Sequence, residues 1–381
     1  MNALLIVTLG LAFLYGILML SYCYGWARLH TFYPSRHAYT FNTKVTVVIP
    51  ARDEENNLPP LLEALQQQSY PANLFEVIVV DDFSEDTTAD VVRYFPAENV
   101  RLVRMSDHLD KTQRLNSYKK KAIELAIKEA TGHLIVTTDA DCVMGPKWLE
   151  TMVKFYETYR PRFIAAPVAY HEEDNFFKRL QSLDFMTMQG ITGAVAYLQT
   201  GTMCNGANLA YEKSAFEEVG GFMGIDMIAS GDDMLLMYKI YHAYPDGVRY
   251  LKSRDAIVRT LPVATVNGFM NQRIRWSSKA DKYEDKRVTR TLVLVYIWNV
   301  MLVLMGVVTI FNHELLYWFA GVLIYKVVIE TIFLVPVAGF FQKLSQLAWF
   351  IPGQPFHIIY VVVAGWLGKF GSYEWKGRQV K

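Results

Sequence analysis

Long apolar runs near both ends of the chain restrict most strongly what it can fold into. Residues 3 to 24, "ALLIVTLGLAFLYGILMLSYCY", contain no charged side chain, and about 20 apolar residues suffice to cross a bilayer as a helix. We therefore expect an N-terminal transmembrane anchor over residues 1–26. Further apolar runs cover residues 291–311, 315–340 and 347–368, and they predict transmembrane or interfacial helices over residues 291–368.

The first run fits an anchor better than a cleaved signal peptide. A signal peptide has a basic start, a shorter apolar core and small residues at its cleavage site. This run has no basic start, and it continues into Trp26 and Arg28, which are typical of a membrane interface. We expect the segment to stay in the mature protein.

Two charges interrupt the third run. Lys326 and Glu330 lie four residues apart, so on a helix they share one face and can pair with each other. One interpretation is a satisfied pair inside the membrane. The other is a pore or a substrate path, because charged residues at that depth often mark function.

Composition narrows the class of protein. The 381 residues are 52% hydrophobic, which is too apolar for an ordinary soluble enzyme, and the net charge of +1 gives no basic field for nucleic acid. The eight histidines show no HxxxH spacing, which argues against a metal site made of histidines. Cys23, Cys142 and Cys204 lie far apart, which indicates neither a disulfide framework nor a zinc site and fits a reducing compartment.

The distribution of basic residues predicts the orientation. They follow the anchor and precede the second run, so the positive-inside rule places the region between them in the cytoplasm, on a chain integral to the inner membrane. Three further spans would leave the basic tail, residues 369–381, outside. We therefore expect one late segment to be interfacial or re-entrant, and the stretch with Pro352 and Pro355 is the candidate.

The central region alternates between strand and helix patterns. Residues 45–49 form an apolar strand that we expect Pro50 to stop, and residues 58–65 follow with leucines at helical spacing. Similar strands are expected near residues 75–80, 100–105 and 133–138. The alternation predicts an α/β domain with a doubly wound, mostly parallel sheet.

Carboxylates gather just after two of these strands. Asp81 and Asp82 follow one strand, and Asp139 and Asp141 follow another. Ligands of open α/β sheets bind at that edge, and like charges brought together there need a compensating cation. Mg²⁺ or Mn²⁺, which bind carboxylates together with substrate phosphates, would fit. Neither GxxxxGK[ST] nor a GxGxxG after the first strand is present, which argues against a P-loop enzyme and a dinucleotide-cofactor enzyme.

Five motifs, in order, now carry a resemblance. They are "VVIPARDEE", "VIVVDDFSEDT", "TTDADC", "SGDDMLL" and "QRIRW". Over residues 44–290 the chain resembles the membrane-bound family 2 glycosyltransferases of GT-A fold, which include cellulose, chitin, hyaluronan and poly-N-acetylglucosamine synthases and ceramide glucosyltransferase. The chain departs from the usual pattern at Asp53, where asparagine is more common, and at Asp232, where glutamate is usual.

The resemblance implies a role for each motif. Asp233 would be the catalytic base, and Asp139 and Asp141 would hold Mg²⁺ or Mn²⁺. Apart from the resemblance, Lys119 or Lys120, just before the helix "AIELAI", could reach the diphosphate; the alternative is that this lysine run is a solvated helix start. The nucleotide-sugar would contact Pro50, Glu54, Asp81, Asp82, Lys119 and Asp139, and the acceptor and diphosphate side would comprise Asp232, Gln272, Arg273, Arg275 and Trp276.

The implied function is an inverting transfer of sugar from a nucleotide-diphosphate donor, expected to be a UDP-sugar, to a membrane-associated lipid or glycan. The alternative is a processive polysaccharide synthase, since the QxxRW motif occurs in both groups. The few predicted spans favour a lipid acceptor, because a polymer channel would require a partner subunit or an oligomer. A non-enzymatic scaffold and a transporter are less consistent with the complete set of acidic residues and the large central domain.

Overall fold

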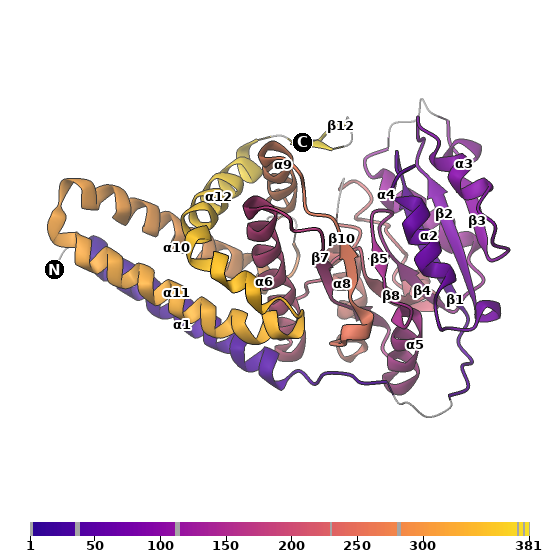
Figure 1. Cartoon of the computed structure of the whole chain (residues 1–381), viewed down its shortest axis with the longest axis horizontal. Helices are drawn as coiled ribbons and strands as arrows, with labels where there is room; N and C mark the ends of the chain where they lie inside the picture. Colours follow the sequence, from indigo (N-terminus) through magenta and orange to yellow (C-terminus); the bar gives the residue numbers. More distant parts are fainter. Residues whose placement is uncertain are drawn as a thin grey trace. The chain divides into compact units, whose positions relative to one another are not determined.

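The computed structural model describes residues 3–34, 39–110, 115–228, 231–279, 283–371, 373–375 and 378–380 (Figure 1). The chain divides into two compact units. One, here called the sheet unit, comprises residues 30–171 and 202–261. The other, the helical unit, comprises residues 1–29, 172–201 and 262–381.

The sheet unit is built on a mixed, mostly parallel sheet, as the sequence predicts. The strand order is β3–β2–β1–β4–β8–β6–β9. Strand β8 runs antiparallel to β4 and β6, whereas the other neighbouring pairs are parallel. The strands are β1 (Val45–Ala51), β2 (Phe75–Asp81), β3 (Val100–Arg104), β4 (Leu134–Thr137), β6 (Phe163–Ala165), β8 (Leu209–Glu212) and β9 (Val248–Tyr250).

Strand β1 extends past Pro50, so the expected stop at that residue is wrong. The strand pairs with β4 only over residues 45–48, but with β2 as far as Ala51. Ala51 faces β2, since its carbonyl accepts from the Asp82 N–H. Alternate residues face opposite neighbours, so Pro50 faces the β4 side, beyond the last paired residue, and its missing N–H costs no ladder bond.

Helices and a small second sheet complete this unit. Four leucines of α2 (Leu58–Gln66) are fully buried on one face, as their spacing predicts. The other helices are α3 (Thr88–Arg93), α4 (Tyr118–Glu129), α5 (Trp148–Tyr159), α7 (Lys213–Glu218) and α8 (Met234–Ala243), with single turns η1 (Ala72–Leu74), η2 (Met105–Asp107), η3 (Pro245–Gly247) and η4 (Arg254–Ala256). The second sheet has the order β5–β10–β7 and consists of β5 (Val143–Met144), β7 (Val168–Tyr170) and β10 (Val258–Thr260).

The helical unit collects three separate segments of the chain. It contains α1 (Ala3–Arg28), α6 (Phe176–Leu198), α9 (Val266–Ser277), α10 (Lys286–Phe311), η5 (His313–Leu315), α11 (Leu316–Phe340), η6 (Leu344–Trp349), α12 (Phe350–Phe370) and the paired strands β11 (Tyr373–Trp375) and β12 (Arg378–Val380). Within the described residues, four segments are long and apolar enough to cross a membrane, which are residues 3–28, 286–311, 313–340 and 344–370. Helix α11 passes through Lys326 and Glu330 without a break.

Glycines allow the helices of this unit to approach closely. A Cβ at Gly16 of α1 would fall 1.8 Å from the Tyr325 hydroxyl of α11, and one at Gly190 of α6 would fall 2.6 Å from a Val337 methyl. Small residues at helix contacts are typical of membrane proteins, where packing replaces the hydrophobic effect as the force between helices. These contacts fix α1 and α6 against α11.

Candidate active site

The loops after β1 and β2 interlock at the carboxyl edge of the sheet. The Asp53 N–H donates to the Ser84 hydroxyl over 3.0 Å, and the Glu85 N–H donates to the Asp53 carboxylate over 2.8 Å. Asp53 has a φ of 51°, a left-handed conformation that Asp and Asn adopt more readily than most residues. This conformation explains why Asp can stand where the family more often has Asn. The Glu54 N–H is held by Thr88 in the same way, over 2.8 Å.

Asp81 and Asp82 are buried at the end of β2. The Asp81 carboxylate accepts from the Ser84 N–H over 3.2 Å and lies 3.8 Å from the Arg104 side chain. Arg52 donates to the Asp82 carbonyl over 3.1 Å. The fold therefore fixes the backbone around both aspartates at the edge where β1 ends at Ala51.

Lys119 lies between two acids from different motifs. Its ammonium group is 2.7 Å from the Asp139 carboxylate, in the turn after β4, and 3.1 Å from the Asp232 carboxylate, just before α8. Burial would lower the pKa of Lys119, but the charges of Asp139 and Asp232 outweigh it and raise that pKa above its usual value. The cation that the clustered acids require is thus supplied in part by the protein itself.

Asp233 stands next to this cluster with its carboxylate oriented by the backbone. One oxygen accepts from the Met234 N–H over 2.7 Å, which caps α8, and the other accepts from the Gly206 N–H over 3.2 Å. A Cβ at Gly206 would lie 3.3 Å from both the Lys119 ammonium and the Asp232 carboxylate. Glycine at this position lets the backbone approach the acids closely.

Asp141 completes the set of acids after β4. Its carboxylate accepts from the Thr260 hydroxyl of β10 over 3.1 Å. Among the described residues, no three His, Cys, Asp or Glu side chains converge as a metal cage. Two carboxylates still fit Mg²⁺ or Mn²⁺, because these ions are commonly held by one or two carboxylates together with substrate phosphates and water. Cys142 is buried beside Asp141, and burial raises the pKa of its thiol well above the usual value, so it is an inert neighbour.

The structure separates the roles of the two lysines considered for the diphosphate. Lys120 is buried, and its ammonium group donates to the carbonyls of Ile225 and Ile228 over 2.6 and 2.8 Å. It therefore holds the loop before the "SGDDM" motif. Lys119 is the lysine at the acidic cluster.

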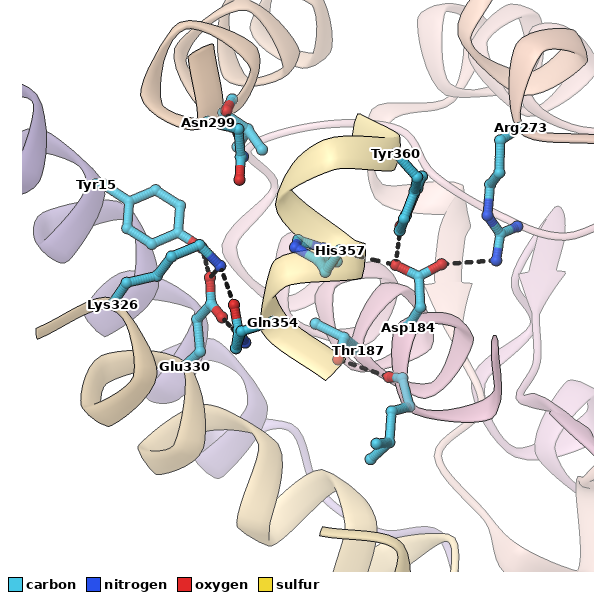
Figure 2. A network of polar contacts seen from close by, with 12 residues as sticks. Tyr15, Asp184, Thr187, Arg273, Asn299, Lys326, Glu330, Gln354, His357 and Tyr360 are labelled. Carbon is cyan, nitrogen blue, oxygen red and sulfur yellow. Dashed lines mark hydrogen bonds and ion pairs between the residues drawn. The ribbon is translucent and has the colours of Figure 1, made fainter. Parts of the chain in front are cut away.

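The QRIRW motif lies on α9, in the helical unit. Arg273 is buried and donates to the Asp184 carboxylate of α6 over 2.6 Å, and Tyr360 of α12 donates to the same carboxylate (Figure 2). The guanidinium of Arg273 also stacks over Trp276, 4.2 Å from the ring centre. The motif therefore contains a buried arginine, Arg273, whose partner is Asp184, while Arg275 is partly buried.

Comparison with known proteins decides the family. The model described as "Glycosyl transferase family 2" matches residues 46–220, and "Glycosyl transferase family group 2" matches residues 134–367, more than half of the chain. The chain belongs to the family 2 glycosyltransferases. The resemblance drawn from the five motifs is thereby confirmed, and the protein is a glycosyltransferase.

Two curated relatives illustrate the range of this family. The glycosyltransferase is 30% identical over 192 residues to the 4,4'-diaponeurosporenoate glycosyltransferase of Staphylococcus haemolyticus, covering 50% of this chain and 48% of that protein. It is 31% identical over 155 residues to the undecaprenyl-phosphate 4-deoxy-4-formamido-L-arabinose transferase of Serratia proteamaculans, covering 39% and 44%. The chain thus spans less than half the length of either relative.

A solved structure extends the likeness to the whole fold. The mannosyltransferase PcManGT from Pyrobaculum calidifontis, in complex with GDP-Man and Mn²⁺, aligns over 96% of each chain with a TM-score of 0.59 and 20% identity. The predicted GT-A fold is confirmed, and the alignment includes the apolar helices.

Some contacts of the site were not predicted from the motifs. Asp184 and Thr260 each hold a motif residue, Arg273 and Asp141 respectively, from a distant part of the chain. Asp184 stands in an otherwise uncharged stretch, "SLDFMTM", and that isolated charge is the signal that could have identified it. Thr260 carries no comparable signal.

Proposed function

We propose that this glycosyltransferase moves a sugar, with inversion, from a nucleotide-diphosphate donor to a lipid or glycan acceptor at the membrane. The observation that carries the proposal is the cluster of Lys119, Asp139 and Asp232 with Asp233 beside it. It combines a cation for the leaving diphosphate with a carboxylate suited to take a proton. Both groups are required for displacement at a sugar carbon.

The donor would lie along the carboxyl ends of β1, β2 and β4. Pro50, Glu54, Asp81 and Asp82 surround the position proposed for the nucleotide base and ribose, and their fixed backbone supports that role. Lys119 would contact the diphosphate. We expect a UDP-sugar, and the GDP-Man bound by the mannosyltransferase from Pyrobaculum calidifontis makes a GDP-sugar the alternative to test.

Asp139 and Asp141 would hold Mg²⁺ or Mn²⁺, and such an ion would offset the charge that develops on the departing diphosphate. The remaining steps use the chain's own groups. Where the acceptor atom is a hydroxyl oxygen, the carboxylate of Asp233 takes its proton. The oxygen then attacks the anomeric carbon from the side opposite the diphosphate, and the bond between that carbon and the diphosphate oxygen breaks. Such a displacement inverts the configuration of the sugar carbon.

The acceptor is proposed to be a lipid or a lipid-linked glycan. The names of two relatives specify a carotenoid acid and undecaprenyl phosphate, both membrane lipids. Gln272, Arg275 and Trp276 are the proposed contacts, and Arg273 would position them. With the basic residues around the spans, this supports an inner-membrane enzyme whose sheet unit faces the cytoplasm.

The test uses membranes that contain the full chain, Mg²⁺ and Mn²⁺, and labelled UDP-glucose, UDP-N-acetylglucosamine, UDP-galactose or GDP-mannose. We expect label in a small species of the organic phase, and its loss in excess EDTA. Membranes with Asp233→Asn are the matched control. Label in a large, water-soluble or insoluble product would instead establish the polysaccharide synthase. Label incorporation equal to that of the control with every donor would contradict the proposed reaction.

A further inference from the structure

We propose that α12 does not cross the bilayer. It enters from the side on which α10 begins and returns to that side, so that its exposed apolar face contacts the acyl chains of one leaflet. The inference rests on contacts within the helical unit and is independent of the proposed reaction.

The beginning of α12 is attached to the charged start of α6. In the segment that leads from α11 into α12, Lys343 forms an ion pair with Glu173. The Trp349 ring lies 5.4 Å from the Arg179 guanidinium and 5.5 Å from the Phe176 ring. Helix α11 ends at Phe340, so α12 starts on the side where α11 ends.

The last turns of α12 are attached to α9. The Ser277 hydroxyl donates to the Ala364 carbonyl over 2.7 Å, and a Cβ at Gly368 would fall 2.0 Å from that same hydroxyl. A Cβ at Gly365 would meet the Tyr296 ring of α10 at 2.6 Å. A helix that crossed the bilayer would instead finish beside the turn η5, which joins α10 to α11.

Helix α9 must itself lie on the side where α10 begins. It ends at Ser277 and α10 begins at Lys286, nine steps later. Fully extended, nine residues reach only about 32 Å, barely the ~30 Å of the hydrocarbon layer. The connection also carries Lys279, Glu284 and Asp285, which would not be stretched through hydrocarbon. Both ends of α12 are therefore held on the same side of the membrane, the side on which α10 begins.

Buried polar contacts hold the first half of α12 as well. Gln354 accepts from the Lys326 ammonium over 2.8 Å and donates to Glu330 over 2.9 Å, near the midpoint of α11. Figure 2 shows these contacts on one side of α12 and the Asp184 group on the other, where His357 lies 3.7 Å from the carboxylate. Lys326 is fully buried and paired, so the structure favours the satisfied pair over the pore. Together these contacts seat α12 among α6, α9 and α11.

The opposite face of α12 is apolar and exposed. Ile351, Ile359, Trp366 and Phe370 are 57–69% exposed, and their spacing places them on one side of the helix. Acyl chains are the partner that fits such a face on a helix seated among apolar spans. A second copy of the chain is the other possible covering.

The first test determines the side of the C-terminus in the full chain. Alkaline phosphatase, which is active only when exported, and green fluorescent protein, which is fluorescent only when retained, are fused after Lys381. The same reporters inserted at the turns 245–247 and 313–315 mark the two sides. We expect the C-terminal fusions to match 245–247. A match with 313–315 would overturn the proposal.

The second test measures how deeply the exposed face of α12 lies in the bilayer. Nitroxides are placed on single cysteines at Ile351, Ile359, Trp366 and Phe370 in vesicles, and at Tyr317, Ile324 and Ile332 of α11 as the matched spanning series. From residue 351 to 370 a perpendicular helix would rise about 28 Å. The α11 series should cross the bilayer centre, whereas the α12 series should stay within ~15 Å of one surface. A centre crossing by α12, or exclusion of oxygen and lipid from its four sites, would contradict the inference.

Discussion

Arg273 and Asp184 form a buried ion pair between two helices whose residues lie 89 positions apart, with the guanidinium 2.6 Å from the carboxylate. Only 5% of the Arg273 side chain and 11% of the Asp184 side chain are exposed. The first arginine of the QRIRW motif therefore joins α9 to α6, and through Tyr360 to α12.

Loss of the Arg273 side chain should act mainly by lowering the stability of the folded protein, and not directly on sugar transfer. We expect Arg273→Leu to destabilise the protein by roughly 3–5 kcal/mol, because a buried carboxylate would be left without its cation. The double variant with Asp184→Leu should recover most of that loss. Arg275→Leu is the comparison, and it should change stability by less than about 1 kcal/mol while lowering transfer. Unfolding of the detergent-solubilised variants measures the first quantity. Equal destabilisation by both arginine substitutions would contradict the distinction.

Asp233 should be needed for turnover and not for donor binding. Asp233→Asn keeps one acceptor oxygen for the N–H of Met234 or of Gly206, loses the other, and removes the base, so kcat should fall by about 10²-fold or more. The Kd of the nucleotide-sugar should change less than threefold. Asp246→Asn, on an exposed turn, is the matched control. Near-normal turnover by Asp233→Asn would remove the base assignment.

Lys119 should contribute far more to catalytic activity than its neighbour Lys121. Lys119→Met leaves Asp139 and Asp232 close together without their shared cation, so we expect kcat/KM to fall by about 10²-fold. Lys121 pairs only at 3.4 Å with Glu124 on a more exposed face, and Lys121→Met should retain at least half of the activity. Initial rates with a labelled donor measure both. The result that would count against the role of Lys119 is an equally small effect of the two substitutions.

Lys252 should make stability depend on pH. Burial lowers the pKa of Lys252 to about 8, from an ordinary 10.5. Below pH 8 the lysine is charged in both states, and the folded state carries a penalty on the order of 3 kcal/mol. Between pH 8 and 10.5 the folded protein binds fewer protons than the unfolded chain, so stability should rise with pH.

Lys252→Met removes that titration. The difference in unfolding midpoint between this variant and the native chain should be largest below pH 8, in favour of the variant, and should shrink towards pH 10.5. A difference that stays constant across this range would show that the ammonium is not the cause.

Gly368 should tolerate no side chain where α12 meets α9. A Cβ there would overlap Ser277, so Gly368→Val should destabilise the helical unit by about 1–3 kcal/mol. At Gly321 of α11, apart from its chain neighbours and the backbone of its own helix, none of the described residues places an atom within 4 Å of the corresponding position. Gly321→Val, the matched variant, should be close to neutral in the same thermal unfolding experiment.

Local patterns predicted the elements whose cause is local. The leucine spacing of α2, the apolar strands β1, β2 and β4 and the long apolar helices follow from residues a few positions apart. The antiparallel β8 and the small second sheet could not be predicted in this way, because their pairing joins distant segments. Chain connectivity alone likewise gave no reason to place α6 and α9 with the apolar helices.

The same limit applies to the site. The motifs indicated Asp139, Asp232 and Asp233, the sequence left Lys119 and Lys120 as alternatives, and the fold brings Lys119 together with the three acids. They could not indicate that Lys119, and not Lys120, meets the acids, because the choice depends on where the carbonyls of Ile225 and Ile228 lie. Nor could the motifs show that Arg273 is the arginine that pairs with Asp184, since Asp184 lies in a segment without a motif.

The contact between Tyr15 and Glu330 joins residues 315 positions apart, near the two ends of the chain. At ~5–20 residues per second, a ribosome needs roughly 15–60 s to add the residues that separate them. During that time α1 is made without α11, its partner at Gly16. Helix α1 therefore completes its packing only after α11 has been made, so a chain that stops before α11 would leave α1 in the membrane with that face uncovered.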